Sequence, residues 1–149
     1  IEMNPDSPVL YKDRGTAYSK LGEYELAKKD FEKSVELDKR FAPGYSALGL
    51  LMATAKDAKV RNPVLAKRFA EKAVSFGDAT TPELTRNLAE VLKAINEDAA
   101  AIFALRKAIA MDSSNKEFQE LLQQWEGNSA SRVSSGVIQP STRLFTNLW

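Results

Sequence analysis

A pattern of large and small residues that recurs after 34 positions limits what this 149-residue chain can fold into. In the first copy, the small residues Gly15 and Ala27 stand among the large residues Tyr11, Tyr18 and Phe31. Small residues let two helices approach closely, and large side chains then fill the space around that contact. The pattern therefore predicts a pair of helices joined by a turn, and its recurrence predicts an array of such pairs.

The pattern occurs three times. The second copy supplies Tyr45, Leu48, Gly49 and Met52 in its first half and Ala66, Ala70 and Ala73 in its second half. The third copy supplies Leu88, Ala89 and Leu92, then Ala101, Leu105 and Ala108. Arg14 stands in the first copy where the other two copies have leucine.

The second halves of the copies are unequally spaced. Ala27 and Ala66 are 39 residues apart, whereas Ala66 and Ala101 are 35 residues apart. A five-residue insertion therefore lies between Met52 and Ala66. We expect it to lengthen the preceding helix by a turn and then to form a short projecting loop at Lys56–Arg61. Such a loop would have few buried contacts and would be the first site of proteolysis within the array.

This arrangement resembles the tetratricopeptide repeat, a helix–turn–helix unit with the pattern W-x2-L-G-x2-Y…A-x3-F…P. The resemblance implies an all-α, right-handed solenoid of three such hairpins with a C-terminal capping helix. Residues 1–7 would end a preceding repeat, and the repeats would span 8–41, 42–81 with the insertion, and 82–115. A capping helix at 116–126, ended by Gly127, and a Ser/Thr-rich tail at 127–149 with an apolar C-terminus would follow.

Capping signals predict where the helices begin and end. Ser7 or Asp6, Asn62 and Thr81 each stand where an N-cap is expected, and Pro8, Pro63 and Pro82 follow at the first helical position. Gly22 and Gly77 predict helix ends. In the third copy, Asn96-Glu97 replaces the glycine turn.

The residue types argue against chemistry within this chain. Cysteine and histidine are both absent, which removes disulfides, thiol nucleophiles, imidazole bases and the usual zinc and haem ligands. The glycines fall at repeat landmarks or helix ends and form no phosphate-binding loop. We therefore predict no enzyme activity, no cofactor and no metal.

Charge and hydropathy point to a soluble chain. The net charge is +1, and no apolar run approaches the roughly 20 residues of a membrane helix. Between Lys56 and Lys72, six basic residues accompany two acids. This stretch either keeps the surface soluble or meets an acidic partner or phosphate. We predict no nucleic acid partner and no membrane insertion, and the cytoplasm is favoured although the compartment stays open.

The resemblance implies a function as well as a fold. We expect a protein-interaction scaffold or adaptor that holds a peptide or partner helix in its concave groove. Two alternatives are an accessory, substrate-recruiting domain of a larger enzyme and a structural subunit of a large assembly. The implied groove residues are Lys12, Thr16, Lys20, Ser46, Ala47, Leu50, Arg86, Asn87, Glu90 and Lys93, with Val9, Asp13, Ala53 and Glu83 beside them.

One specialised branch of the family receives chaperone tails by holding a C-terminal carboxylate with lysine, asparagine and arginine side chains. The corresponding positions here are Lys12, Thr16, Ala47, Glu83 and Asn87. Only Lys12 matches, and Glu83 would repel a carboxylate. The residues therefore argue against that ligand.

The end of the chain combines two compositions. Residues 129–142 are typical of a disordered segment, whereas the last six are strongly apolar. We expect Leu144, Phe145, Leu148 and Trp149 to dock in an apolar groove, either on the chain's own repeats or on a neighbouring molecule. The second arrangement would produce self-association. A tail held only by an external contact is the alternative.

Overall fold

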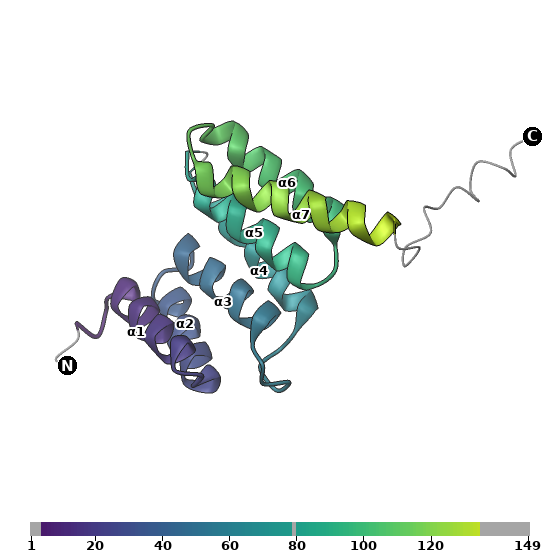
Figure 1. Cartoon of the computed structure of the whole chain (residues 1–149). Coiled ribbons are helices and arrows are strands. Elements are labelled where there is room, and N and C mark those ends of the chain that lie inside the picture. Colours follow the sequence, from purple (N-terminus) through teal and green to yellow (C-terminus); the bar gives the residue numbers. More distant parts are fainter. Residues whose placement is uncertain (1–3, 79, 135–149) are drawn as a thin grey trace, which may run out of the picture.

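The computed structural model describes residues 4–78 and 80–134, and all regular structure within these ranges is helical. The helices are α1 (Pro8–Lys20), α2 (Tyr24–Leu37), α3 (Ala42–Thr54), α4 (Pro63–Phe76), α5 (Pro82–Ala94), α6 (Asp98–Met111) and α7 (Lys116–Ser134). Figure 1 shows that they follow one another as an array of antiparallel pairs. The predicted all-α fold of helical hairpins is confirmed.

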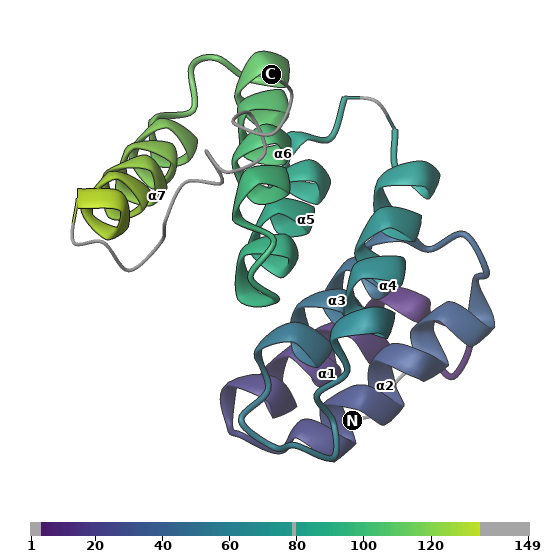
Figure 2. The same ribbon diagram turned by 90° about the vertical axis from the view of Figure 1, so that its right-hand side faces the viewer.

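The three hairpins α1/α2, α3/α4 and α5/α6 have the same dimensions. Each pairs a helix of 13 residues with one of 14. Helix α3 contacts both helices of the first hairpin, α5 contacts both helices of the second, and α7 lies on α6. Figure 2, which turns the molecule by 90°, shows this succession from the side. Each hairpin therefore buries its apolar surface against the next one, as repeat arrays require.

Most of the predicted helix starts are observed. The Ser7 hydroxyl accepts a hydrogen bond from the Leu10 N–H at 3.4 Å, and the Asn62 side chain accepts one from the Leu65 N–H at 3.0 Å. Proline stands in the first turn of α1, α4 and α5. Thr81 precedes α5, but its side chain makes no capping bond.

Close helix contact within each hairpin depends on small residues. A Cβ atom on Gly15 would lie 2.7 Å from the ring of Phe31, and one on Gly49 would lie 3.0 Å from the carbonyl oxygen of Ala66. Ala27, Ala66 and Ala101 are fully buried at the corresponding positions of α2, α4 and α6. The predicted role of these landmark residues is thus visible in the packing.

The tight turns of the first and third hairpins have the same geometry. Gly22 and Asn96 both adopt the left-handed conformation, with φ of 80° and 66°. In each turn the left-handed residue donates its N–H to the carbonyl three residues back, and the next residue donates to the carbonyl five residues back. Asparagine tolerates this conformation better than most residues with a side chain, so Asn96 can replace the glycine.

The second hairpin corrects the expectation about the insertion. Helix α3 is 13 residues long, as are α1 and α5, so the insertion does not lengthen it. All the additional residues lie in the connection to α4. That loop is not devoid of buried contacts, because Val60 is only 2% exposed and belongs to the main core cluster. Burial of one apolar side chain is enough to fold the loop back onto the hairpin.

The last helix corrects a second expectation. Helix α7 continues through Gly127 to Ser134, so Gly127 does not end it. Phe118 and Trp125 are 3% and 7% exposed and hold the helix against the third hairpin. Glycine inside a helix costs only about 1 kcal/mol, which this burial outweighs. In the part of the chain that the structure describes, no helix is both long and apolar enough to cross a membrane.

Candidate functional site

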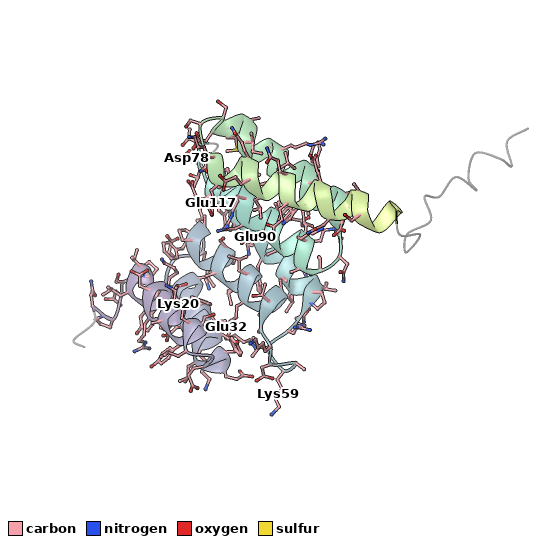
Figure 3. All side chains as sticks on the ribbon, viewed as in Figure 1. Lys20, Glu32, Lys59, Asp78, Glu90 and Glu117 are labelled. Carbon is pink, nitrogen blue, oxygen red and sulfur yellow. The ribbon has the colours of Figure 1, made fainter. Side chains whose placement is uncertain are left out.

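The first helices of the three hairpins lie side by side and form one face of the molecule. Helix α3 lies in the middle and contacts both α1 and α5. In the orientation of Figures 1 and 3 this α1–α3–α5 face is turned toward the viewer, with Lys20 on α1 and Glu90 on α5. All ten predicted groove residues lie on these three helices.

A hollow of about 240 Å³ opens between α1 and α3, and we call it the α1–α3 hollow. It is lined by Thr16, Ser19, Lys20, Phe31, Ala47, Leu50, Leu51 and Thr54. Four of the predicted groove residues are therefore brought together here: Thr16, Lys20, Ala47 and Leu50. Apolar atoms form most of the exposed lining, so the hollow suits an apolar side chain.

Sequence reasoning missed half of the hollow. Ser19 and Thr54 follow the predicted residues Thr16 and Leu50 by three and four positions, which is the spacing of one helix face. This helical spacing could have identified Ser19 and Thr54 from the sequence. Phe31 and Leu51, at 3% and 4% exposed, are the buried part of the lining; the sequence predicted Phe31 only as a packing residue and did not single out Leu51.

Lys12 and Thr16 already have partners. The Lys12 ammonium lies 2.5 Å from a carboxylate oxygen of Asp13, and the Thr16 hydroxyl donates to the Lys12 carbonyl at 2.9 Å. Lys20 is exposed and forms no ion pair with a described residue. Lys20 is therefore the cation available beside the hollow.

The α5 side of the face is a network of paired polar groups. Arg86 lies 2.9 Å from Glu90 and 3.5 Å from Glu117 of α7. Lys93 pairs with Asp98 at 3.0 Å and lies over the ring of Trp125. Figure 3 shows Glu90 and Glu117 on these neighbouring helices. These side chains join α5 to α6 and α7, so a partner would have to displace existing contacts.

Two further predicted groove residues, Ser46 and Asn87, contact each other between neighbouring hairpins. The Asn87 amide donates to the Ser46 hydroxyl at 2.9 Å, which ties α5 to α3. Ser46 is only 4% exposed and is thus out of reach of a partner. Of the flanking positions, Val9, Asp13 and Glu83 are exposed and Ala53 is buried.

Burial also changes the acidity of Glu90. It raises the pKa of the Glu90 carboxyl above its usual value, and the negative charge of Glu117 acts in the same direction. The positive charge of Arg86 opposes both effects. The network thus holds a carboxylate that is more easily protonated than an exposed one.

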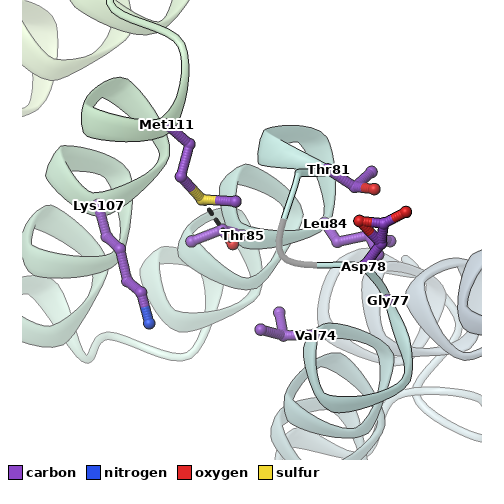
Figure 4. A pocket seen from close by; sticks show the side chains of 8 residues that line it. All are labelled: Val74, Gly77, Asp78, Thr81, Leu84, Thr85, Lys107 and Met111. Atoms are coloured by element: carbon purple, nitrogen blue, oxygen red, sulfur yellow. Dashed lines mark hydrogen bonds between the residues drawn. The ribbon is translucent and has the colours of Figure 1, made fainter.

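A second hollow, of about 300 Å³, lies between α4, α5 and α6, beside the residues that follow α4 (Figure 4). Val74, Leu84 and Met111 supply apolar lining, and the buried Thr85 hydroxyl donates to the Met111 sulfur at 3.7 Å. A Cβ atom on Gly77 would lie 2.2 Å from Cδ1 of Leu84, so a larger residue there would make the Leu84 side chain shift. No sequence signal pointed to this hollow, because it forms between residues from three helices.

Two other predictions can be placed only in part. Within residues 4–78 and 80–134, no group of three or more acidic side chains is arranged to hold a metal ion. The predicted docking residues Leu144, Phe145, Leu148 and Trp149 lie outside the described residues.

Comparison with known proteins identifies the repeat. Residues 8–41, the range of the first predicted repeat, match the family model of the tetratricopeptide repeat. Small glutamine-rich tetratricopeptide repeat-containing protein 2 of Mycosarcoma maydis is 39% identical over 49 residues, covering 33% of this chain and 14% of that protein. Hsp70-Hsp90 organizing protein 2 of Arabidopsis thaliana is 40% identical over 57 residues, covering 38% of this chain and 10% of that protein. The matched regions are thus small parts of these relatives.

Solved structures extend the likeness to nearly all of the described helices. The first tetratricopeptide repeat domain of human RPAP3 superimposes with a TM-score of 0.72 at 16% identity, covering 89% of this chain and 99% of that one. The TPR2B domain of yeast Sti1, in a complex with an Hsp70 peptide, gives 0.66 at 20% identity, covering 81% and 97%. At such identities the likeness concerns the fold alone. Residues 8–41 therefore match the tetratricopeptide repeat, and the described helices together have the fold of tetratricopeptide repeat domains.

Proposed function

We propose that this chain is a protein-interaction module whose α1–α3–α5 face binds a segment of a partner protein. The observation that carries the proposal is the α1–α3 hollow, where Ala47, Leu50 and Leu51 form apolar lining beside the exposed Lys20. An extended segment with an aliphatic side chain followed by an acidic one fits this combination. The module acts by binding, and we assign it no catalytic step.

The comparisons support an interaction role without naming the partner. Related proteins are named as Hsp70-Hsp90 organizing proteins, and one similar structure is a tetratricopeptide repeat bound to the HSP90 peptide SRMEEVD. The residues of this chain do not favour such a tail. Ala47 offers no hydrogen bond from its side chain, Thr16 donates within its own helix, and the exposed Glu83 carries a negative charge. We therefore expect recognition of an internal segment.

The test begins with display of random peptides of about 12 residues, long enough to span about 40 Å when extended. Recovered peptides are then titrated against the Leu50→Glu variant, which places a charge in the α1–α3 hollow. We expect binding to weaken about tenfold or more, because one buried contact is worth at least about 1.4 kcal/mol. Leu26→Glu is the matched control, since Leu26 is 42% exposed on α2 and lies outside the hollow.

Fluorescence anisotropy measures the affinities, and unfolding curves check that both variants remain folded. Equal weakening by the two variants would contradict the assignment of the hollow. Tighter binding of SRMEEVD than of its scrambled sequence would contradict the proposal that the chain recognises an internal segment.

A further inference from the structure

The inserted loop between α3 and α4 is held to the rest of the molecule by packing and hydrogen bonds. Val60 is buried in the main core, and the Asn62 N–H donates to the Met52 carbonyl at 2.9 Å. The Arg61 guanidinium donates through Nε to the Ala55 carbonyl at 3.2 Å. These contacts hold the backbone of the loop, so the points from which its exposed side chains project are defined.

Two hollows adjoin this loop at the edge of the array where helices turn back. One, of about 420 Å³, is lined by Pro63, Val64, Lys67, Arg68, Glu71, Ile95 and Glu97. The other, of about 280 Å³, is lined by Ala53, Arg61, Pro63, Ala94, Ile95 and Asn96. They share Pro63 and Ile95, and Val64 is 70% exposed beside them. We call the loop and these two hollows together the turn-edge surface.

The charges of the turn-edge surface are unbalanced. The Lys67 ammonium forms an ion pair with Glu97, whose two carboxylate oxygens lie 2.7 and 2.9 Å from Lys67 Nζ. Asp57 caps the loop by accepting the N–H of Lys59 at 2.9 Å. On this surface, four exposed cations form no ion pair with any described residue: Lys56, Lys59, Arg61 and Arg68. Glu71 is the one exposed acid among the described lining residues that likewise forms no ion pair. Figure 3 places Lys59 at the end of the molecule, beyond the helix ends.

We propose that the turn-edge surface binds an acidic segment of a partner protein that places an aliphatic side chain against Val64 and Ile95. The unpaired cations complement the acids, and the exposed apolar lining accounts for the aliphatic residue. The chain's own residues 135–149 do not fit, because they contain no acid and one arginine. A nucleic acid strand fits less well, since no aromatic ring lines either hollow for a base to stack on. The unpaired cations of this surface lie on the inserted loop and on α4, outside the α1–α3–α5 face, and the proposal does not depend on the function of that face.

The test selects peptides on a chain whose other candidate face is blocked. Random peptides of about 12 residues are displayed against the Leu50→Glu variant, so that binders of the α1–α3 hollow are not recovered. We expect the recovered peptides to be rich in aspartate and glutamate and to contain an aliphatic residue. Recovery of no peptide above background, or of peptides without excess acid, would overturn the proposal.

Matched variants then locate the binding. The double variant Lys59→Ser/Arg68→Ser should weaken binding about tenfold or more, and Val64→Ser should weaken it by a similar factor. Lys29→Ser/Lys39→Ser removes the same charge from exposed residues elsewhere and should change the affinity less than about twofold. Equal losses in the two double variants would show a response to net charge only and would overturn the site. Displacement of the peptides by a single-stranded oligonucleotide at lower concentration would overturn the choice of an acidic protein segment.

Discussion

The first and third hairpins have the same helix lengths and the same left-handed turn, yet different chemistry holds them together. In the first, the Arg14 guanidinium binds both carboxylate oxygens of Asp30 at 2.7 Å, and this raises the pKa of Arg14 further above its usual value. In the third, the corresponding residues are Leu88 and Ala104. The repeat therefore demands a contact between its two helices at this point but accepts an ion pair or apolar side chains.

The largest expected loss of stability is in the third hairpin, where the contact between the two helices is apolar. Leu105 is fully buried on α6, so Leu105→Ala should lower the free energy of unfolding by about 2–5 kcal/mol. Phe103→Ala on the same helix is the control, because Phe103 is 73% exposed and its loss should stay within about 0.5 kcal/mol. Urea unfolding measures both. Similar losses for the two variants would mean that α6 does not face the core as described.

The ion pair of the first hairpin should show an intermediate effect. Arg14→Ala leaves the 6%-exposed Asp30 without its donors and should cost about 1–3 kcal/mol. Asp30→Ala should cost less, because the Arg14 side chain is 42% exposed and can be hydrated.

The double variant Arg14→Leu/Asp30→Ala copies the third hairpin and sharpens the comparison. We expect it to recover most of the stability lost in Arg14→Ala, since apolar side chains often replace an ion pair without loss. If its loss instead equals the sum of the two single losses, the two hairpins are not interchangeable at this contact.

The smallest effect concerns the two turns. Gly22→Ala should cost about 1 kcal/mol, because φ is positive while no atom lies within 4 Å of the new Cβ atom. Asn96→Gly should change stability by only a few tenths of a kcal/mol, since Asn96 already occupies the same conformation. Thermal unfolding of the pair compares them. A larger loss of stability from Asn96→Gly than from Gly22→Ala would contradict the statement that a side chain in this left-handed conformation costs stability.

The sequence predicted those parts of the fold that depend on neighbours along the chain. Asn62-Pro63 begins α4 because the cap and its partner are three residues apart. Gly15 and Ala27 mark the helix contact because a hairpin of fixed length brings them together. The prediction that Gly127 ends the last helix was wrong, because that helix is held by the burial of Phe118 and Trp125 and not by local preference.

What the sequence by itself determined is the repeating hairpin, because its period, its small residues and its turn residues act within one repeat. The tertiary structure decided which predicted groove residues are available. Ser46 bonds with Asn87, 41 positions away, and Arg86 with Glu117, 31 positions away. It also decided that Val60 folds the inserted loop back onto the core. Such contacts depend on how one hairpin is rotated against the next, and that rotation is fixed by the whole interface between repeats, which no local pattern records.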